Sequence, residues 1–345
     1  MGRYEAMREL RNQYRSRKRI LIRDGVGVYH VISRMVRREF LLGPQEREAF
    51  CGLLHQQAEF AGIEVLSFCV MSNHVHLLLR VPPVESFSDS DLLARYARYY
   101  GADKVPLSAY SVEELRCILQ EGGSFAASVR ARILCRMGNL PAFMRELKQR
   151  FSIWYNHKHE NQGTIWAARY KSLIVEDAPE TLTRVAAYID LNPVRAEIVT
   201  DSKDYRWCSY AAALVGQGRA REGLLRLFGQ KRDYSEALAA YRLILYGTGY
   251  QSKRGVVTRV GTIPVERLEA VVRQNGRVPL AELLRIRIRY FADGVALGSK
   301  EFVERTFNEN RGEFGPNRKR GGVPLPEGAW GGTHVLRDLK RSVYG

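Results

Sequence analysis

The sequence has 345 residues, of which 45% are hydrophobic and 26% are charged, a composition typical of a globular chain with one large or two smaller domains. It carries 54 Lys and Arg against 37 Asp and Glu, a formal net charge of +17, which favours a polyanionic partner, nucleic acid before an anionic membrane surface. No stretch approaches the roughly 20 apolar residues of a membrane span, and the charged N-terminus does not have the pattern of a secretory signal.

The first part of the chain predicts a strand, a helix and a hairpin. Residues 28–33 are rich in β-branched and aromatic side chains, which predicts a strand. A helix is predicted to begin at Pro44 and end at Gly62. Strands over 63–71 and 74–81 are separated by Ser72-Asn73, and so short a turn predicts an antiparallel hairpin.

The next part adds a second helix and a fourth strand. Residues 85–138 are interpreted as a helical insertion, and a helix restarts near Pro141. A strand over 172–176 and a helix from Pro179 to about Asn192 follow. The order β-α-β-β-α-β is that of the α+β, ferredoxin-like split βαβ fold with an antiparallel sheet. We expect helices on one face of this sheet and a site on the face left open.

Composition divides the chain into four regions. Residues 1–25 form a basic arm, and 26–215 form the main domain with its insertion over about 85–138. A helical segment and linker occupy 216–261, with the Gly-rich linker itself over 246–261. Residues 262–345 are predicted to form a small basic domain, a candidate for DNA binding, which contains an alternating apolar and basic run over 283–290.

Two histidines form the sharpest local signal. Alternation along a strand places His74 and His76 on one face and Val75 on the other. Two imidazoles at this spacing can share one divalent metal, although a pair of structural or solvent-facing histidines is the alternative. The next alternate position is Leu78, so the His-x-His-x-His pattern of histidine-triad hydrolases is incomplete. A second pair, His157 and His159, lies in a polar loop and is interpreted as solvated or DNA-facing.

Tyr188 and Asn192 form the second candidate cluster. They are four residues apart, so a helix places them on one face. The ordinary interpretation of Tyr188 is a half-buried tyrosine beside an apolar stripe. The ordinary interpretation of Asn192 is a turn or capping residue before Pro193.

Three segments taken together resemble the single-tyrosine HUH (insertion-sequence-200-like) transposases. They are His74-Val75-His76 after the hairpin turn, the stretch 163–172, and the stretch from Tyr188 to Arg195. The Tyr-x-x-x-Asn pattern followed by Pro-Val is similar to that of the REP-associated tyrosine transposases. The likeness covers about residues 26–215 apart from the insertion. The insertion and the C-terminal extension resemble a longer subgroup of the family.

The resemblance implies an enzyme that cuts and rejoins single-stranded DNA. His74, His76 and Asn192 would bind a divalent metal, Mg²⁺ or Mn²⁺, and Tyr188 would attack a phosphodiester to form a 5′-phosphotyrosine link. Tyr170 and Tyr155 are the next candidates for the nucleophile. The implied partner is single-stranded or hairpin (REP-like) DNA, bound by a monomer or a homodimer. A domesticated protein that binds structured DNA or RNA without cutting it is the alternative.

Two further expectations concern DNA contacts and location. Candidate phosphate contacts come from basic residues near the motifs, and Trp154, Trp166 and Tyr170 are candidates for stacking on bases; the basic residues are Arg145, Lys148, Arg150, Arg169, Lys171 and Arg195. Surface charges and core aromatics are the alternative interpretation of each. The five cysteines form no CxxC pair, which argues against a zinc ribbon and fits a reducing cytoplasm. The resemblance implies a bacterial protein associated with the nucleoid.

Overall fold

The computed structural model describes most of the chain. It covers residues 20–22, 25–83, 88–100, 110–229, 233–249, 295–316, 318–319, 321–324 and 332–336. Most of the predicted basic arm, most of the predicted linker over 246–261 and the alternating run over 283–290 lie outside the described residues.

The predicted β-α-β-β-α-β order is present. Its elements are β1 (Gly27–Arg34), α2 (Pro44–Ala61), β2 (Glu64–Val70), β3 (His74–Val81), α6 (Leu140–Lys158) and β4 (Lys171–Val175). The four strands lie in the order β2-β3-β1-β4, and each is antiparallel to its neighbour. This arrangement confirms the predicted α+β, ferredoxin-like fold.

Local chemistry explains why α2 begins and ends where it does. Pro44 occupies the start of the helix, where its fixed φ is already helical and its missing N–H is no loss. Gly62 ends the helix with φ 67°, a left-handed conformation that glycine adopts without steric strain. Both predicted ends of this helix are confirmed.

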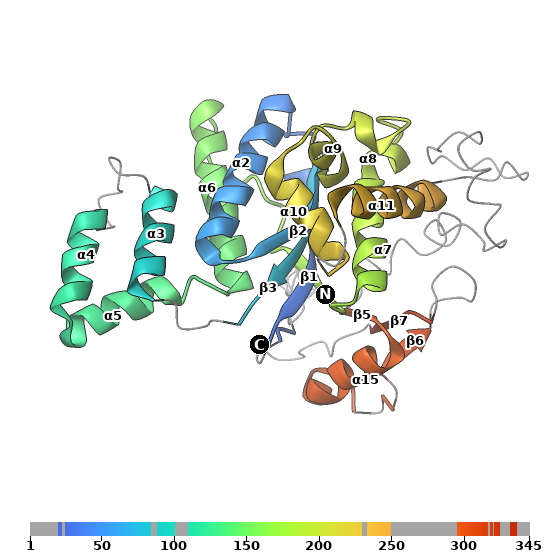
Figure 1. Ribbon diagram of the computed structural model, residues 1–345. Helices are drawn as coiled ribbons and strands as arrows, with labels where there is room; N and C mark the ends of the chain where they lie inside the picture. The colour runs from blue at the N-terminus through green and yellow to red at the C-terminus, as the bar shows by residue number, and fades with distance from the viewer. Residues whose placement is uncertain are drawn as a thin grey trace, which may run out of the picture.

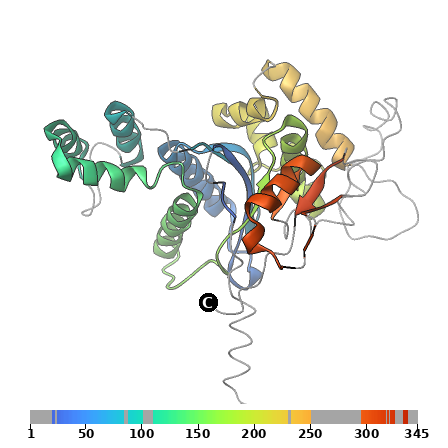
Figure 2. The same ribbon diagram turned by 90° about the horizontal axis from the view of Figure 1, so that it is seen from below.

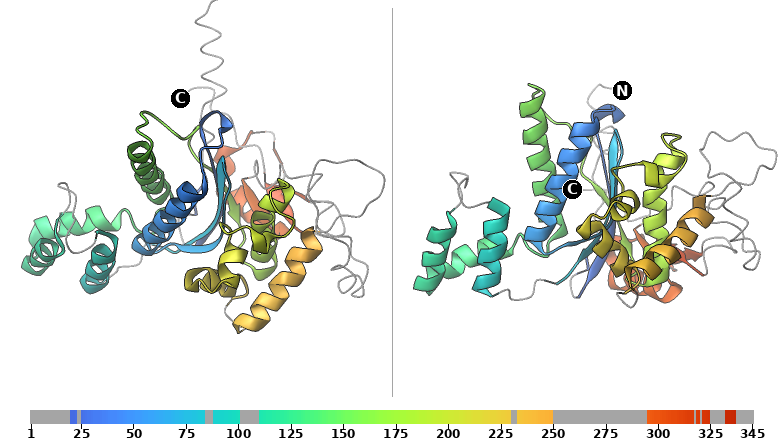
Figure 3. Two further views of the ribbon diagram at one scale, coloured as in Figure 1. Left: turned by 90° about the horizontal axis from the view of Figure 1, so that it is seen from above. Right: turned by 45° about the horizontal axis from the view of Figure 1, so that its top comes forward.

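Helices cover both faces of the sheet (Figures 1 and 3). On one side α2 packs against α6 and β2. On the other side α7 (Pro179–Asp190), α9 (Ser209–Leu214) and α10 (Gly218–Leu227) pack against β2, and α11 (Tyr234–Gly249) packs on α7 and α10. The expectation of an open second face was therefore wrong, because the segment after residue 178 folds back over the sheet.

A buried carboxyl group ties the outer helix to α7. Asp190, the last residue of α7, is 1% exposed. It accepts hydrogen bonds from the Tyr241 hydroxyl of α11 (2.5 Å) and the Tyr210 amide of α9 (3.1 Å). Burial raises the pKa of the Asp190 carboxyl to about 7, although these donors oppose the shift. The end of α7 is thus fixed from two sides.

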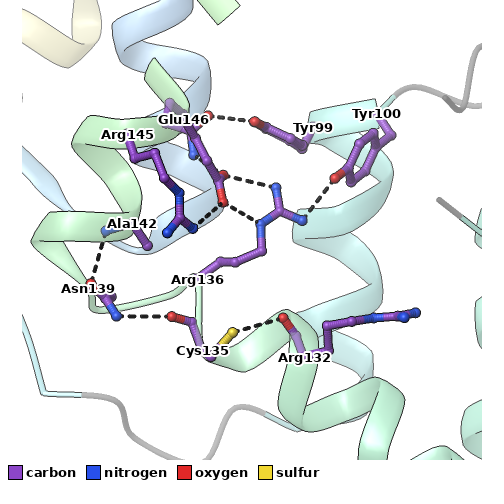
Figure 4. A network of polar contacts seen from close by, with 10 residues as sticks. Tyr99, Tyr100, Arg132, Cys135, Arg136, Asn139, Ala142, Arg145 and Glu146 are labelled. Atoms are coloured by element: carbon purple, nitrogen blue, oxygen red, sulfur yellow. Dashed lines mark hydrogen bonds and ion pairs between the residues drawn. The ribbon is translucent and has the colours of Figure 1, made fainter. Parts of the chain in front are cut away.

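The insertion has a small core of its own. Its helices are α3 (Asp89–Tyr100), α4 (Val112–Glu121) and α5 (Gly123–Leu134), whose apolar side chains pack against Phe60 of α2. Arg136, just after α5, donates to both carboxylate oxygens of Glu146 on α6, at 2.8 and 3.0 Å, and to the Tyr100 hydroxyl (Figure 4). The insertion is therefore held by an ion pair to α6 as well as by apolar contacts with α2.

The C-terminal part extends the same sheet (Figure 2). It comprises β5 (Ala296–Gly298), α15 (Lys300–Glu309), the 3-10 turn η4 (Arg311–Glu313), β6 (Gly322–Pro324) and β7 (His334–Leu336). Strand β5 is parallel to β4, and the described strands follow the order β2-β3-β1-β4-β5-β7-β6. The carboxylate of Glu176 accepts hydrogen bonds from the Ser299 amide and hydroxyl at this junction. The described strands of this region, β5, β6 and β7, therefore lie in the same sheet as β1 to β4.

The described part of the chain contains neither a membrane-spanning helix nor a disulfide. None of its helices is long and apolar enough to cross a membrane. Its five cysteines are all free thiols.

Candidate active site

Strand β3 presents the two predicted histidines to α7. The strand follows the Ser72-Asn73 turn, and its register places His74 opposite Arg34 and His76 opposite Ile32 of β1. Because strand side chains alternate, His74 and His76 share one face. Their ring centres are 5.0 Å apart, so one ion can lie within reach of both rings.

Helix α7 brings Tyr188 to the same place. Leu182, Val185 and Ile189 pack α7 into the core, and Tyr188 lies on the side that faces the strands. Its ring centre is 6.0 Å from that of His76, edge to face. The phenol is only 2% exposed. The structure thus brings together the tyrosine and the imidazole pair that the sequence motifs single out.

A third histidine, which sequence analysis missed, belongs to this cluster. His30 of β1 is fully buried, and its Nε2 lies 2.9 Å from Nδ1 of His76 in a hydrogen bond. Its ring centre is 5.9 Å from that of Tyr188. The available signal was one titratable residue inside the apolar strand Val28–Ile32. A buried polar side chain needs a hydrogen-bond partner, and here the partner is a candidate ligand.

Asn192 and Arg195 come from the short helix α8 (Asn192–Arg195) that follows α7. The Asn192 amide nitrogen donates to the backbone carbonyls of Tyr188 and Ile189, both at 3.1 Å. Its amide oxygen is the atom left to serve as a ligand. The Arg195 guanidinium lies 4.7 Å from the Tyr188 ring centre, and within the described residues its buried Nη1 has no hydrogen-bond partner.

The charge state of the imidazoles suits metal binding. Burial, reinforced by Arg34, lowers the pKa of His74 to about 4. Burial, and then the neighbouring His74, His30 and Arg195, hold the pKa of His76 well below its usual value. Both rings are neutral at pH 7, the form that coordinates a divalent ion. Two neutral imidazoles on one strand face are ligands that suit a divalent ion such as Mn²⁺ and leave its other positions open.

This donor set lacks carboxylate. Across the described residues, no three His, Cys, Asp or Glu side chains gather where they could hold a metal. An ion at His74 and His76 would therefore take its remaining ligands from Asn192, water or a phosphate group.

The predicted DNA contacts include exposed residues and half-buried ones. Arg145 is 70% exposed at its side chain, and Arg169 and Lys171 are exposed. Lys148 donates to the Ala168 carbonyl, and Arg150 donates to Gln56 beside the Tyr99 ring of the insertion. The last two side chains have structural contacts, which the sequence did not reveal.

The aromatic candidates Trp166 and Tyr170 lie in the core. They are 7% and 6% exposed, and the Trp166 indole donates to Ser152 and the Lys148 carbonyl of α6. Base stacking by these two rings is therefore not supported, because neither ring face is open to solvent. Their burial favours the alternative interpretation, core aromatics, that the sequence also allowed.

The second histidine pair does not join the cluster. His159 contacts the Glu46 carboxylate at 3.1 Å, and its ring lies 4.3 Å from that of Tyr155. Both residues belong to the α6 end of the α2–α6 layer, across the sheet from α7 (Figure 1). Tyr155 belongs to α6, which packs with α2, whereas the imidazole pair faces α7.

Two comparisons with known proteins found a likeness to part of this chain. Residues 26–96 match the family described as "Transposase IS200 like". This IS200-like transposase domain match includes His30, His74 and His76 but ends before Tyr188. The solved structure of a REP-associated tyrosine transposase bound to a REP hairpin aligns with 58% of this chain and 86% of that chain, with a TM-score of 0.33 and 13% identity. A likeness at this level transfers no residue role. The comparison with curated proteins gave no match.

Proposed function

We propose that this protein is a metal-dependent endonuclease and strand transferase of single-stranded DNA, a transposase in which Tyr188 is the nucleophile. The substrate is hairpin-forming DNA, REP-like hairpins among them. The observation that carries the proposal is the position of Tyr188 beside the imidazole pair. The centre of its ring lies 6.0 Å from that of His76, although the two residues come from elements far apart in the sequence. The IS200-like match over residues 26–96 supports the same class of reaction.

The proposed chemistry consists of two exchanges of one phosphoester for another. The Tyr188 oxygen loses its proton and attacks phosphorus, the bond to the 3′-oxygen breaks, and that oxygen leaves as a hydroxyl after gaining a proton. The 5′-phosphate remains on Tyr188. A 3′-hydroxyl then attacks the phosphotyrosine, and the phenol is released and regains its proton. Each step replaces one phosphoester bond by another. Rejoining the DNA therefore needs no energy from nucleotide hydrolysis.

The surrounding side chains have roles that follow from their chemistry. A phosphate oxygen would satisfy the unpaired Arg195 Nη1 beside Tyr188, and this charged contact would stabilise the developing negative charge. His74, His76 and Asn192 would hold the divalent ion, which when bound polarises the phosphate. Because Tyr188 is 2% exposed, the DNA reaches it only when covering side chains move.

The test is covalent capture of DNA. A library of labelled single-stranded hairpins with varied loops and flanks is incubated with the full chain and Mn²⁺ or Mg²⁺, and the products are separated on a denaturing gel. We expect a protein–DNA adduct that chelator prevents. The Tyr188→Phe variant should form none and should bind the same hairpins within about threefold, a change of less than 1 kcal/mol.

Tyr29→Phe is the matched control. Tyr29 is also 2% exposed, but it lies on β1 one position from His30 and therefore points to the opposite face. This variant should keep the adduct. If Tyr188→Phe still forms the adduct, the nucleophile is another residue. If the wild type binds hairpins but forms no adduct with either metal, the non-cleaving binding protein is the better description, as the burial of Tyr188 would then suggest.

A further inference from the structure

We propose that Asn73 and His30 are positioning residues, which fix the tautomers of His74 and His76 so that both Nε2 atoms present a lone pair to one divalent ion. The role of the ion rests on the proposed function. The tautomers themselves are properties of the metal-free protein and can be measured without DNA.

The His74 tautomer follows from the two ends of the Asn73 amide. The Asn73 amide nitrogen donates to the Arg38 backbone carbonyl at 3.3 Å, and its oxygen lies 2.6 Å from Nδ1 of His74. A carbonyl can only accept, so the nitrogen end must face Arg38 and the oxygen end must face His74. An amide oxygen also only accepts, so His74 must donate from Nδ1. A neutral ring with its proton on Nδ1 has its lone pair on Nε2.

The backbone that orients Asn73 is itself unusual. Arg37 and Arg38 both have left-handed backbone conformations, with φ of 50° and 60°. Such conformations are strained for residues other than glycine and persist only where surrounding contacts impose them. Here the Met35 amide donates to the Asn73 carbonyl and the Leu42 amide to the Ser72 carbonyl, both at 2.9 Å. The segment Met35–Leu42 is thus anchored on the turn before β3, where it presents the Arg38 carbonyl to Asn73.

His30 performs the matching role for His76. In the β1–β3 register His76 lies opposite Ile32 and His30 lies opposite Leu78, so the two histidines are diagonal neighbours on one face. Their rings are stacked at 22° with centres 5.2 Å apart, and the hydrogen bond joins His30 Nε2 to His76 Nδ1 at 2.9 Å. Two rigid strands therefore hold this contact.

Only one of the two possible proton positions allows His76 to bind a metal. If His76 donates from Nδ1, its Nε2 has a lone pair; if it accepts there, its Nε2 carries the proton and cannot coordinate. Metal-bound imidazoles commonly donate their second N–H to an acceptor, which fixes the ring and strengthens the ligand. We infer that His30 Nε2 is this acceptor, just as the Asn73 oxygen is for His74.

The first measurement is the tautomer state by long-range ¹H–¹⁵N NMR of the metal-free full chain. Signals are assigned with His74→Gln and His76→Gln variants. We expect the proton on Nδ1 for both rings, and a shift of the His74 proton toward Nε2 in Asn73→Ala. A proton on Nε2 of His74 in the wild type, or an unchanged His74 signal in Asn73→Ala, overturns the assignment to Asn73. A proton on Nε2 of His76 in the metal-free protein overturns the assignment to His30.

The second measurement is Mn²⁺ affinity, followed by the electron paramagnetic resonance of free Mn²⁺ in the absence of DNA. Loss of the acceptor in Asn73→Ala or His30→Phe should weaken binding about 10–100-fold. Asn73→Asp and His30→Gln keep an acceptor oxygen and should restore most of the affinity. Asn310→Ala removes an amide that donates to the Thr306 carbonyl at the C-terminal end of α15, outside the histidine cluster, and should change nothing.

Failure of the inference is separable from failure of the proposed function. If Asn73→Ala and His30→Phe bind Mn²⁺ within twofold of the wild type while Tyr188 still forms the adduct, the inference fails and the function stands. If the tautomers are as expected but no hairpin yields an adduct, the function fails alone. Should His30→Phe not fold, His30→Gln and the wild-type His76 signal still decide the case.

Discussion

Replacement of Arg136 by Met tests how the helical insertion is held to the rest of the protein (Figure 4). The substitution keeps the apolar part of the side chain but removes both hydrogen bonds to Glu146 and the one to Tyr100. It also removes the guanidinium 4.5 Å from the Phe60 ring centre. Glu146 would then be a largely buried carboxylate with only Gln57 (2.9 Å) as a close donor and Arg145 at 3.9 Å.

The expected loss of stability follows from this burial. Removing one partner of a buried ion pair costs about 3–5 kcal/mol. The Arg136 and Glu146 side chains are 21% and 15% exposed, so water screens part of this loss. We therefore expect about 2–3 kcal/mol in the free energy of unfolding. Urea titration measures the total, and hydrogen exchange should show that α3, α4 and α5 open before the sheet does.

Arg145 provides a matched control on the same carboxylate. Its side chain is 70% exposed, so Arg145→Met should cost less than about 0.5 kcal/mol. The double variant Arg136→Met/Glu146→Met replaces the pair by apolar side chains and should recover most of the loss. The reasoning is refuted if Arg136→Met costs no more than Arg145→Met, or if the two substitutions in the double variant simply add.

Two other substitutions test the packing of the second helical layer and the salt dependence of DNA binding. An Ala side chain at Gly223 of α10 would place its Cβ 2.6 Å from the Val65 carbonyl oxygen, so Gly223→Ala should cost about 1–3 kcal/mol. Gly52→Ala, on the exposed side of α2 with no atom within 4 Å, should instead add about 0.5–1 kcal/mol; a lower urea midpoint for both would contradict the geometry. Lys171→Gln should reduce the slope of log Kd against log salt for hairpin DNA by about 1. Arg116→Gln, a side chain of the insertion paired with Glu113, should leave that slope unchanged, and equal slopes for both variants would remove Lys171 from the interface.

Local patterns predicted what depends on local geometry. Strand alternation was enough to place His74 and His76 on one face, and helical spacing was enough to place Tyr188 near Asn192. The ends of α2 followed from Pro44 and Gly62 because those residues have few alternative conformations. The split βαβ order then predicted the antiparallel arrangement of β1 to β4.

Contacts between distant segments could not be predicted in the same way. His30 is an ordinary strand residue by pattern, and only the diagonal pairing of β1 with β3 reveals its contact with His76. The pairing of β5 with β4 joins Ile174 to Ala296 across more than a hundred residues, and no local signal encodes such a partner. For Trp166 and Tyr170 the sequence allowed both base stacking and a place in the core, and only the folded structure shows that the rings are buried.

The electrostatics of the site lead to a last prediction, which concerns the order of binding. The charged groups among the described residues that act on His76 are Arg195 and Arg34, and both are cations. A bare divalent ion at His74 and His76 is therefore repelled by two guanidinium groups and meets neutral ligands only. A phosphodiester reverses this balance, because its negative charge attracts the ion and the guanidinium groups alike. Metal and DNA should thus bind with positive coupling, and the coupling must be equal in both directions.

We expect Mn²⁺ to bind at least about fivefold more tightly to the Tyr188→Phe protein when hairpin DNA is present. The substitution Arg195→Gln should reduce this factor, because it should strengthen Mn²⁺ binding in the absence of DNA. If Mn²⁺ affinity is the same with and without bound hairpin, the cationic surroundings do not control the ion.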